Sequence, residues 1–401
     1  MHDPGKGHWQ GCEMDSAVSS KTVDVGLVFE QDETLESIFC HVPLIHLVPV
    51  CHLSKSWNRA LFSSLRHFNK PKPWLIVHSQ TSRPPYTTAA SSVAYDPRSN
   101  LWLRINHDPP VEYVSDLRSS NSTLLYMLSI SKFSFSFDPL HLTWHQADPP
   151  LVWRTDPVVG ILDRRHIVVA GGAWDFEDDP LSVEIYDLET RKWDTCESIS
   201  AIFEHSAASM WLSIAANTKT LYAMEQASGI TCSFDPISRI WLGPFDLRHD
   251  PNIYFSVIGI SRDNLIMLGL LGNSENVKDI KIWELKGESF ELFKEIGAMP
   301  KELVEKLKEE HASLSSIKIS LTGDVLYIFN PEEPKELVVC EIDGRQRVSR
   351  WGSLKNSMVN DGGRVTERAV LTCADVSLGD LRKAMKFGKG SFSTVNNGIL
   401  Q

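Results

Sequence analysis

Hydrophobic and polar positions follow two different patterns along the chain. From about residue 74 onward, short apolar runs rich in β-branched and aromatic residues alternate with turn-forming clusters, as in "PWLIVHS", "HIVVAGGAW" and "VLYIFNP". Such runs, bounded by Gly, Pro, Asn or Asp, are typical of β-strands. Between Asp32 and Phe68 apolar residues instead recur at helical spacing, and Pro43 and Pro49 interrupt the helices. The pattern predicts a short helical module followed by a long all-β domain.

A sequence motif, which we call the repeated phrase, recurs along the β domain. In each copy an aromatic residue precedes an acid, and a Trp follows six positions after that acid. Four copies with identical internal spacing are very unlikely to arise by chance. Their acid and Trp positions are Asp96 and Trp102, Asp138 and Trp144, Asp187 and Trp193, and Asp235 and Trp241.

Two weaker copies extend the series. Trp283-Glu284 leads to Phe290, whereas Cys340-Glu341 reaches Trp351 four positions late. The six acids recur with a period of roughly 50 residues, which fits four-stranded kelch-type propeller blades. We therefore predict an all-β propeller of six blades over residues 69–381. The Asp would make the turn between the two outer strands of a blade, and the Trp would pack between blades.

The ends of the propeller and its insertions can also be predicted. "RAVLTCADV" (368–376) supplies a strand that would complete the first blade and close the ring. Residues of about 299–314 are rich in helix formers and predict a surface helix between blades five and six. The compositions of 1–24 and 382–401 predict a disordered N-terminus and a flexible C-terminal tail, which leaves 25–68 for the helical module.

Composition narrows the class of function. The net charge of −11 argues against a nucleic-acid partner. No apolar run approaches the ~18 residues of a membrane span, and we expect no membrane partner. Seven scattered Cys without a CxxC motif indicate reduced thiols rather than a zinc site or disulfide framework. These features favour a cytoplasmic and/or nuclear location.

Motifs for catalysis or cofactor binding are not found. The sequence lacks GxSxG, HExxH and P-loop patterns, and "FGKGS" misses the first Gly of a phosphate loop. His141 and His145 flank Trp144 in a predicted strand, so we interpret them as structural. A copper-oxidase propeller would need His and Tyr ligands gathered on the axis, and nothing marks such a set. We expect no catalytic residue, no metal and no cofactor; a propeller enzyme is the least favoured alternative.

An acidic loop is the candidate for target binding. "AWDFEDDP" (173–180) follows a Gly-Gly doublet and admits two interpretations, a solvated connection or a binding loop. Aromatic residues amid charge have the composition of an interface hot spot, and loops on rigid scaffolds commonly bind partners. The candidate substrate-binding residues are Trp174, Asp175, Phe176 and Glu177.

The helical module resembles a known motif. "LESIFCHVPLIHLVPVCHLSKSWNRAL" is similar to an F-box, with an I-F-x-x-V-P step, a central Leu and Val, and then S-K-x-W. The repeats resemble kelch repeats of the form Y/F-D-x5-W. Together the two motifs cover most of the chain, and the chain resembles a plant F-box/kelch-repeat protein.

This resemblance implies a non-catalytic substrate receptor of an SCF-type ubiquitin ligase. The F-box would bind the Skp-family adaptor, which bridges to a cullin, and the kelch ring would hold a target protein for ubiquitination and proteasomal degradation. The adaptor-facing positions implied by the motif are Leu35, Ile38, Pro43, Leu44, Leu47, Val50, Lys55 and Trp57.

The resemblance also suggests a target. "HVPLIHLVPVCHLSKSWNRAL" and "VVGILDRRHIVVAGGAWDFEDDPLSVEIYD" are most similar to the group directed at chalcone synthase, so the implied target is that enzyme or another phenylpropanoid enzyme. The alternative is a kelch interaction scaffold without ubiquitin-ligase function. A scaffold has no use for the excess apolar residues of the helical module.

Overall fold

The computed structural model describes most of the chain in two compact units. The first comprises residues 33–42 and 49–70, and the second comprises 43–48 and the chain from 71 onward. The described residues are 33–67, 70–81, 92–107, 115–120, 123–173, 179–287, 289–308, 313–358, 367–386 and 390–395.

The first unit is a small helical assembly. Ser54 caps α3, since its Oγ accepts the Trp57 amide at 3.1 Å. The Ser64 hydroxyl in α3 donates to the Glu36 carbonyl at 2.8 Å, and the Phe39 ring lies 5.6 Å from the Trp57 ring. These contacts hold the first helix against α3. The elements are a helix over 33–39, the 3₁₀ helix η1 (Pro49–His52) and α3 (Lys55–His67).

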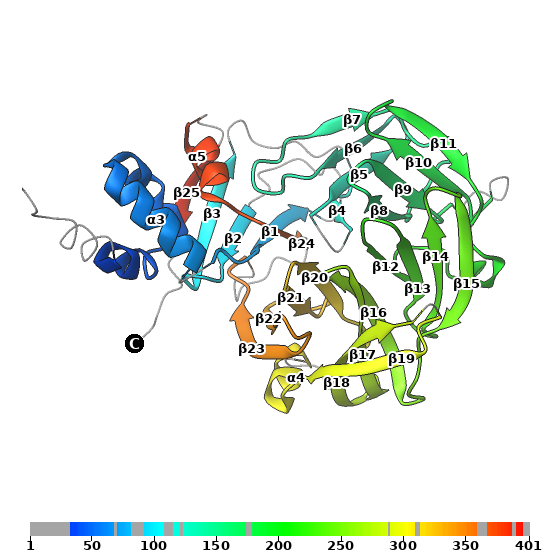
Figure 1. Cartoon of the computed structure of the whole chain (residues 1–401). Coiled ribbons are helices and arrows are strands. Elements are labelled where there is room, and N and C mark those ends of the chain that lie inside the picture. The colour runs from blue at the N-terminus through cyan, green and yellow to red at the C-terminus, as the bar shows by residue number, and fades with distance from the viewer. Residues whose placement is uncertain are drawn as a thin grey trace, which may run out of the picture. The chain divides into compact units, whose positions relative to one another are not determined.

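The second unit is a β-propeller of six antiparallel sheets arranged around a central axis (Figure 1). This confirms the predicted fold and blade number. The innermost strand of each blade lines a cavity on the axis. In blade order these strands are β24 (Glu367–Ala374), β4 (Arg118–Ser119), β8 (Val158–Leu162), β12 (Leu212–Ala216), β16 (Ile253–Ser261) and β20 (Lys318–Thr322).

Three further strands complete each blade outward, and blade 1 has a fourth. Neighbouring strands alternate in direction, as the consecutive hairpins of the sequence require. The strands are β1 (Trp74–Thr81), β2 (Ser92–Asp96), β3 (Leu101–His107) and β25 (Gly390–Thr394) in blade 1; β5 (Leu125–Ser129), β6 (Lys132–Ser136) and β7 (His145–Ala147) in blade 2; β9 (His166–Ala170), β10 (Val183–Asp187) and β11 (Lys192–Cys196) in blade 3; β13 (Leu221–Glu225), β14 (Ile230–Asp235) and β15 (Ile240–Asp246) in blade 4; β17 (Asn264–Asn273), β18 (Asn276–Lys286) and β19 (Leu292–Ala298) in blade 5; and β21 (Val325–Phe329), β22 (Glu336–Ile342) and β23 (Val348–Lys355) in blade 6.

The ring is closed by the two ends of the propeller sequence. β24 pairs with β1 along the whole of both strands, from Trp74 opposite Ala374 to Thr81 opposite Glu367. In Figure 1 the orange-red β24 lies beside the blue β1. The predicted closing strand is therefore confirmed, and blade 1 is built from the first and last parts of the propeller sequence.

The repeated Trp packs between adjacent blades, as predicted. Trp193 of blade 3 donates its indole N–H to the Asp148 carbonyl at 2.8 Å, and its ring meets that of Phe133 in blade 2 at 5.7 Å. Trp241 of blade 4 repeats this arrangement and donates to the Glu197 carbonyl at 3.2 Å. Each such Trp ties its blade to the preceding one.

The repeated Asp shapes the turn that precedes the Trp. The Asp187 carboxylate accepts the amides of Glu189 and Thr190 at 2.7 and 3.1 Å, and Arg191 then adopts φ 57°. Asn100, Leu142 and Arg239 occupy the same place in their turns and also have positive φ, between 51° and 60°. The side-chain acceptor thus stabilises a left-handed position without glycine.

Blade 2 departs from the repeat. Tyr186 and Phe234 lie directly opposite their Trp residues, but in blade 2 the ladder places Phe135 opposite His145, and their rings stack at 5.4 Å. A shift of one residue turns side chains to the other face of a strand. Trp144 nevertheless packs on a cluster that contains Leu125 of blade 2 and Val370 of blade 1, so it also lies between adjacent blades, and only its position in the ladder differs from that of the other Trp residues.

The two weaker copies behave differently from each other. Trp283 lies opposite Glu295 rather than Phe290, because a longer hairpin replaces the short turn. Its phrase is therefore not a structural copy of the others. Cys340 does lie directly opposite Trp351, so the extra residues of that copy only lengthen the turn.

The predicted surface helix is shorter than expected. α4 (Lys301–Lys308) buries Val304 and Leu307. Residues 313–317 are not helical, because the Leu314 amide instead donates to the Ser274 carbonyl at 2.9 Å and its side chain is fully buried.

The expectation of a flexible tail from residue 382 is wrong for two segments. α5 (Leu378–Lys386) begins with a capping box, in which the Ser377 amide donates to the Asp380 carboxylate at 3.0 Å and the Ser377 hydroxyl accepts the Asp380 amide at 3.2 Å. β25 then pairs with the outer edge of β3. Another short helix, α2 (Leu44–Leu47), contacts α5 in this unit.

The turn of blade 2 binds α5 through a titratable pair. His141 Nδ1 lies 2.7 Å from the Asp138 carboxylate, and Nε2 lies 3.1 Å from the Asp380 carbonyl. The hydrogen bond to Asp138 raises the pKa of His141, and bonds from His141 lower the pKa of Asp138. Protonated His141 can donate to both partners at once.

We expect this pair to stabilise the fold in a limited pH window. The His141 contribution is complete below its unfolded pKa of about 6.5 and is lost as pH rises through the raised folded value. The Asp138 contribution is lost as pH falls below about 3.8. The destabilisation caused by His141→Gln, measured by urea unfolding, should be larger at pH 5.5 than at pH 8.5, though below about 1 kcal/mol because Asp138 is partly exposed. Equal destabilisation at both pH values would contradict this.

Candidate functional site

The helical unit exposes large apolar side chains. α3 is amphipathic and buries Ala60, Leu61 and Leu65 on one face. Exposed apolar groups gathered on a small module are typical of a surface that a partner covers. Among its described residues the unit exposes four large apolar side chains, which we call the apolar patch; they are Ile38 (52% exposed), Leu53 (64%), Trp57 (37%) and Phe62 (51%).

The predicted adaptor-facing residues fall into three groups. Ile38, Lys55 and Trp57 are exposed, while Leu35, Pro43 and Val50 are half-buried. Leu44 and Leu47 are fully buried in α2, so in this conformation they support packing and offer no surface to an adaptor. The sequence interpretation missed Leu53 and Phe62. For Phe62 the available signal was an apolar residue outside the buried stripe of an amphipathic helix.

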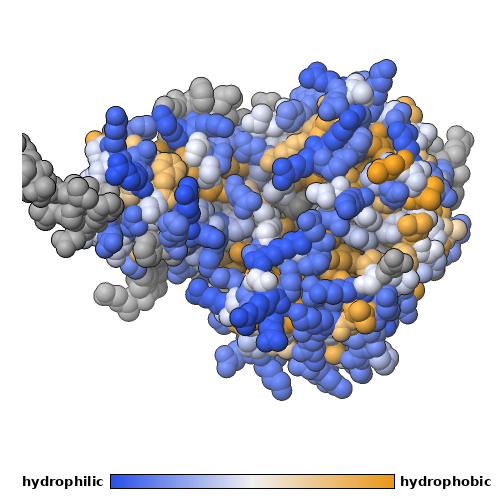
Figure 2. Space-filling view, viewed as in Figure 1, coloured by the Kyte–Doolittle hydropathy of each residue, from blue (hydrophilic) through white to orange (hydrophobic). Residues whose placement is uncertain are grey.

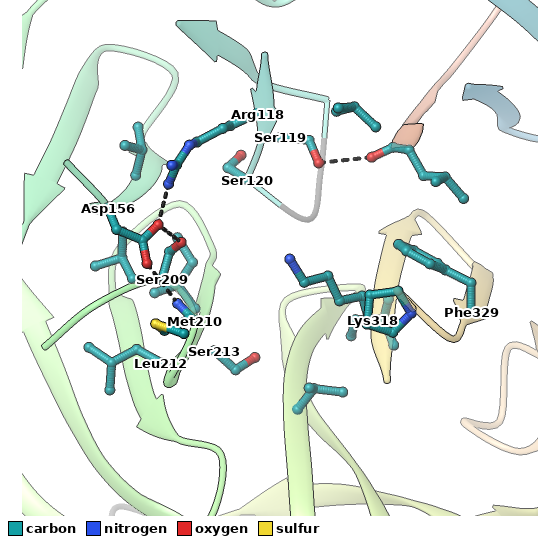
Figure 3. A pocket seen from close by; sticks show the side chains of 18 of the residues that line it. Arg118, Ser119, Ser120, Asp156, Ser209, Met210, Leu212, Ser213, Lys318 and Phe329 are labelled. Carbon is teal, nitrogen blue, oxygen red and sulfur yellow. Dashed lines mark hydrogen bonds and ion pairs between the residues drawn. The ribbon is translucent and has the colours of Figure 1, made fainter. Parts of the chain in front are cut away.

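A cavity of about 400 Å³ lies on the propeller axis, lined by the inner strands of all six blades. Its charged lining residues are Arg118, Asp156, Lys318 and Arg368. Figure 3 shows Arg118 and Asp156 on one side and the Lys318 ammonium pointing into the open space from the other. The charges come from inner strands or from the segment just before one.

Both arginines of the cavity are paired. Arg118 bonds to the Asp156 carboxylate, which also accepts the Ser209 hydroxyl at 2.5 Å and the Met210 amide at 3.2 Å. Arg368 lies 3.2 Å from the Asp116 carboxylate and donates to the Leu117 carbonyl. Asp116 also lies 3.8 Å from Arg118 and so bridges the two guanidinium groups.

Lys318 differs from both arginines. Among the residues that the structure describes, its ammonium makes no hydrogen bond or ion pair. The side chain is open to the channel yet surrounded by protein. Loss of water contacts and repulsion from Arg368 and Arg118 lower the pKa of Lys318, and Asp156 partly opposes this.

The Gly-Gly doublet fixes the base of the acidic loop beside this cavity. Gly171 and Gly172 have φ of 65° and 72°, a conformation that favours glycine. The Gly172 amide donates to the Ala207 carbonyl at 2.6 Å, and a Cβ at Gly172 would clash with the backbone carbonyl of Asp156. The four candidate residues of the loop itself, Trp174, Asp175, Phe176 and Glu177, lie outside the described residues.

A buried ion pair holds both arms of this loop. Arg154 lies 3.0 Å from the Glu184 carboxylate, and both side chains are at most 1% exposed. Arg154 also donates to the carbonyls of Gly171 and Ser182 at 2.7 and 2.9 Å, and Glu184 accepts the Leu151 amide at 2.6 Å. The sequence interpretation missed this pair, because its partners lie on different segments and no local pattern joins them.

An open groove of about 480 Å³ adjoins the cavity and shares Arg118 and Tyr126 with it. Ile130 and Trp153 line this groove and are exposed. In the space-filling view, hydrophilic residues cover much of the visible face, and hydrophobic residues lie scattered between them (Figure 2). The cavity and groove together offer cationic and apolar contacts side by side.

The described part of the chain shows neither a metal-binding cluster nor a membrane-spanning helix. No three His, Cys, Asp or Glu residues there gather closely enough to hold a metal ion. None of the described helices is long and apolar enough to span a membrane.

The fold and its surfaces define a class, a six-bladed propeller protein with an additional helical module that exposes an apolar patch. The chain is 41% identical over 372 residues to an F-box/kelch-repeat protein of Arabidopsis thaliana, covering 90% of this chain and 94% of that protein. The chain therefore belongs to the plant F-box/kelch-repeat family. A scan against protein-family models finds no match.

Solved structures resemble the chain only distantly. A chain from a nidogen/laminin complex aligns with a TM-score of 0.41 at 10% identity, over 75% of this chain and 98% of that one. A chain from a mitotic checkpoint complex aligns with a TM-score of 0.34 at 13% identity, over 63% of this chain and 69% of that one. Neither likeness bears on function.

Proposed function

We propose that this protein is the substrate-recognition subunit of an SCF-type ubiquitin ligase. The helical unit would bind the Skp-family adaptor, and through it a cullin, while the propeller would bind the protein to be ubiquitinated and degraded. Membership in the F-box/kelch-repeat family supports this function. The main structural support for this function is the apolar patch of Ile38, Leu53, Trp57 and Phe62. Exposing these large apolar side chains to water is unfavourable unless a partner covers them.

The mechanism would be proximity rather than chemistry. A receptor that holds a target beside the transfer machinery converts a bimolecular encounter into an effectively intramolecular one. Such a receptor is non-catalytic and acts in the cytoplasm and/or nucleus. The sequence resemblance alone supports chalcone synthase or another phenylpropanoid enzyme as the target. A binding measurement between purified chalcone synthase and the full chain tests this target. No binding at micromolar concentration would exclude chalcone synthase as the target.

We expect the apolar patch to be required for adaptor binding. Full-length protein should co-purify with the Skp-family adaptor, and Leu53→Ser combined with Trp57→Ala should weaken this binding by at least about tenfold, since buried aromatic anchors commonly contribute ~2 kcal/mol or more at interfaces. Co-purification and calorimetry measure the effect.

The control must separate binding from folding. Leu292→Ser replaces an exposed apolar residue of the propeller and should leave adaptor binding unchanged. Leu53 and Trp57 lie outside the propeller unit, so the double variant should keep the wild-type melting temperature of the propeller. Because Trp57 also contacts Phe39, far-ultraviolet circular dichroism must show that the helices of the variant remain folded. Undiminished adaptor binding by the double variant would contradict the proposed surface, and failure of wild-type protein to bind any adaptor would favour the scaffold alternative.

A further inference from the structure

We propose that the channel of the propeller contains a subsite for a carboxylate side chain of the bound target, with Lys318 as its ion-pairing residue. This inference rests on the proposed function, in which the propeller holds a target protein. It identifies where on the propeller the target binds and which chemistry it presents there.

The charges around the channel leave one cation uncompensated. Arg118 pairs with Asp156, Arg368 pairs with Asp116, and Asp116 lies near both arginines. Lys318 is the third cation and has no counterpart among the described residues. Among the described residues, three positive and two negative groups therefore leave one net positive charge, and the Lys318 ammonium points into a cavity of about 400 Å³. An anion would complete the set.

The fold itself does not require this ammonium. Lys318 is exposed to the channel, but an unpaired charge close to two other cations is unfavourable there as well. Both neighbours of Lys318 in the sequence serve the core, since Ile317 and Ile319 are buried. A position that is electrostatically costly and makes no internal bond is typical of a binding residue.

The surroundings favour a side chain of a protein over a free ion. The groove that shares Arg118 and Tyr126 with the cavity leads to Ile130 and Trp153, which are exposed apolar residues. A peptide segment can place an acid in the channel and an apolar residue in the groove at the same time. Interfaces commonly combine such an apolar anchor with charged contacts around it.

A peptide-binding experiment with the full chain tests the proposal. Random peptides displayed on phage are selected on wild-type protein, and the affinities of enriched peptides are measured by calorimetry. We expect a shared acidic residue whose replacement by the corresponding amide weakens binding at least about tenfold, as for a lost charge-assisted hydrogen bond.

The protein variants provide the second half of a double-mutant cycle. Lys318→Gln should weaken the acidic peptide by a similar factor and leave the amide peptide unchanged. Lys192→Gln, a control at an exposed position of the outer strand β11, should change neither. Lys318→Gln should melt no earlier than wild type, because no internal partner is lost.

Several results would overturn the assignment. These are enriched peptides without a common acid, no enriched peptide at all, or equal affinity of wild type and Lys318→Gln for the acidic peptide. Displacement of peptide by free glutarate at low millimolar concentration, without a common acid, would assign the site to a small carboxylate instead. Adaptor binding is measured on the same preparations, so its loss would count against the proposed function and not against the subsite.

Discussion

Ending the chain after Met358 should abolish the cooperative unfolding transition of the propeller. The truncation removes β24, which pairs with β1 along its whole length. It also removes Val370, Leu371 and Cys373, which are buried. Each fully buried aliphatic side chain contributes about 1.5 to 3 kcal/mol, and the exposed face of β1 adds to the loss. The sum is comparable to the whole stability of a typical domain, about 5 to 15 kcal/mol.

Thermal and urea unfolding followed by near-ultraviolet circular dichroism measure this effect. A matched control ends the chain after Val395, which keeps β24, α5 and β25, and should unfold like wild type. A truncated protein that still melts cooperatively within a few degrees of wild type would show that blade 1 does not need the closing strand.

Glu184→Ala should be the most damaging single substitution in blade 3, destabilising the protein by about 3 to 5 kcal/mol. The change would leave the fully buried Arg154 guanidinium without its counter-charge and the Leu151 amide without its acceptor. Because Arg154 also holds the carbonyls of Gly171 and Ser182, the arms of the acidic loop should loosen as well.

Denaturant unfolding gives the size of this effect, and a compensating variant tests its cause. Arg154→Met combined with Glu184→Leu removes both charges and should recover part of the loss, since an uncompensated buried charge is worse than an apolar pair. Glu225→Ala removes a half-buried strand carboxylate of the neighbouring blade, which bonds to the Ser228 hydroxyl instead of a buried arginine, and should cost far less. A Glu184→Ala protein as stable as the Glu225→Ala protein would contradict the role assigned to the pair.

Much of the fold could be predicted from the repeated phrase, because the contacts that it specifies lie within one hairpin. The acid accepts two backbone amides of its own turn, and the Trp lies opposite the aromatic residue that precedes the acid. Both contacts fix the spacing between these residues in the sequence. The closing strand could be predicted for the same reason, since six blades with one incomplete sheet need one more strand. Spacing alone could not predict the strand pairing of blade 2. Trp144 keeps the spacing of the repeated phrase, but the pairing of β6 with β7 is shifted by one residue relative to the other copies.

The C-terminal segment and the helical unit show a second limit. Gly and Ser near the end of the chain suggested flexibility, yet the Ser377 capping box starts a helix and the free edge of β3 provides partners for β25. The capping box was visible in the sequence. Burial of Leu44 and Leu47 in α2 was not, and neither was the contact of α2 with α5, a helix from the opposite end of the sequence.

The candidate site was the least predictable feature. Arg118, Lys318 and Arg368 come from three different blades, and nothing in the residues beside Lys318 marks it out. Only ring closure brings them around one cavity. Sequence composition did direct attention to the acidic loop, whose Gly-Gly base proves to lie against Asp156 of that cavity; a binding role for the loop itself stays a prediction.

Closure by the two ends of the propeller also sets the order of events during synthesis. β3 of blade 1 ends at His107, and β24 begins only at Glu367, so the other five blades leave the ribosome before blade 1 can be completed. At about 5 to 20 residues per second, synthesis of that stretch lasts on the order of tens of seconds. Throughout that time the inner edge of β1 has no partner strand, so every newly made molecule passes through an open ring that chaperones or a second nascent chain can engage.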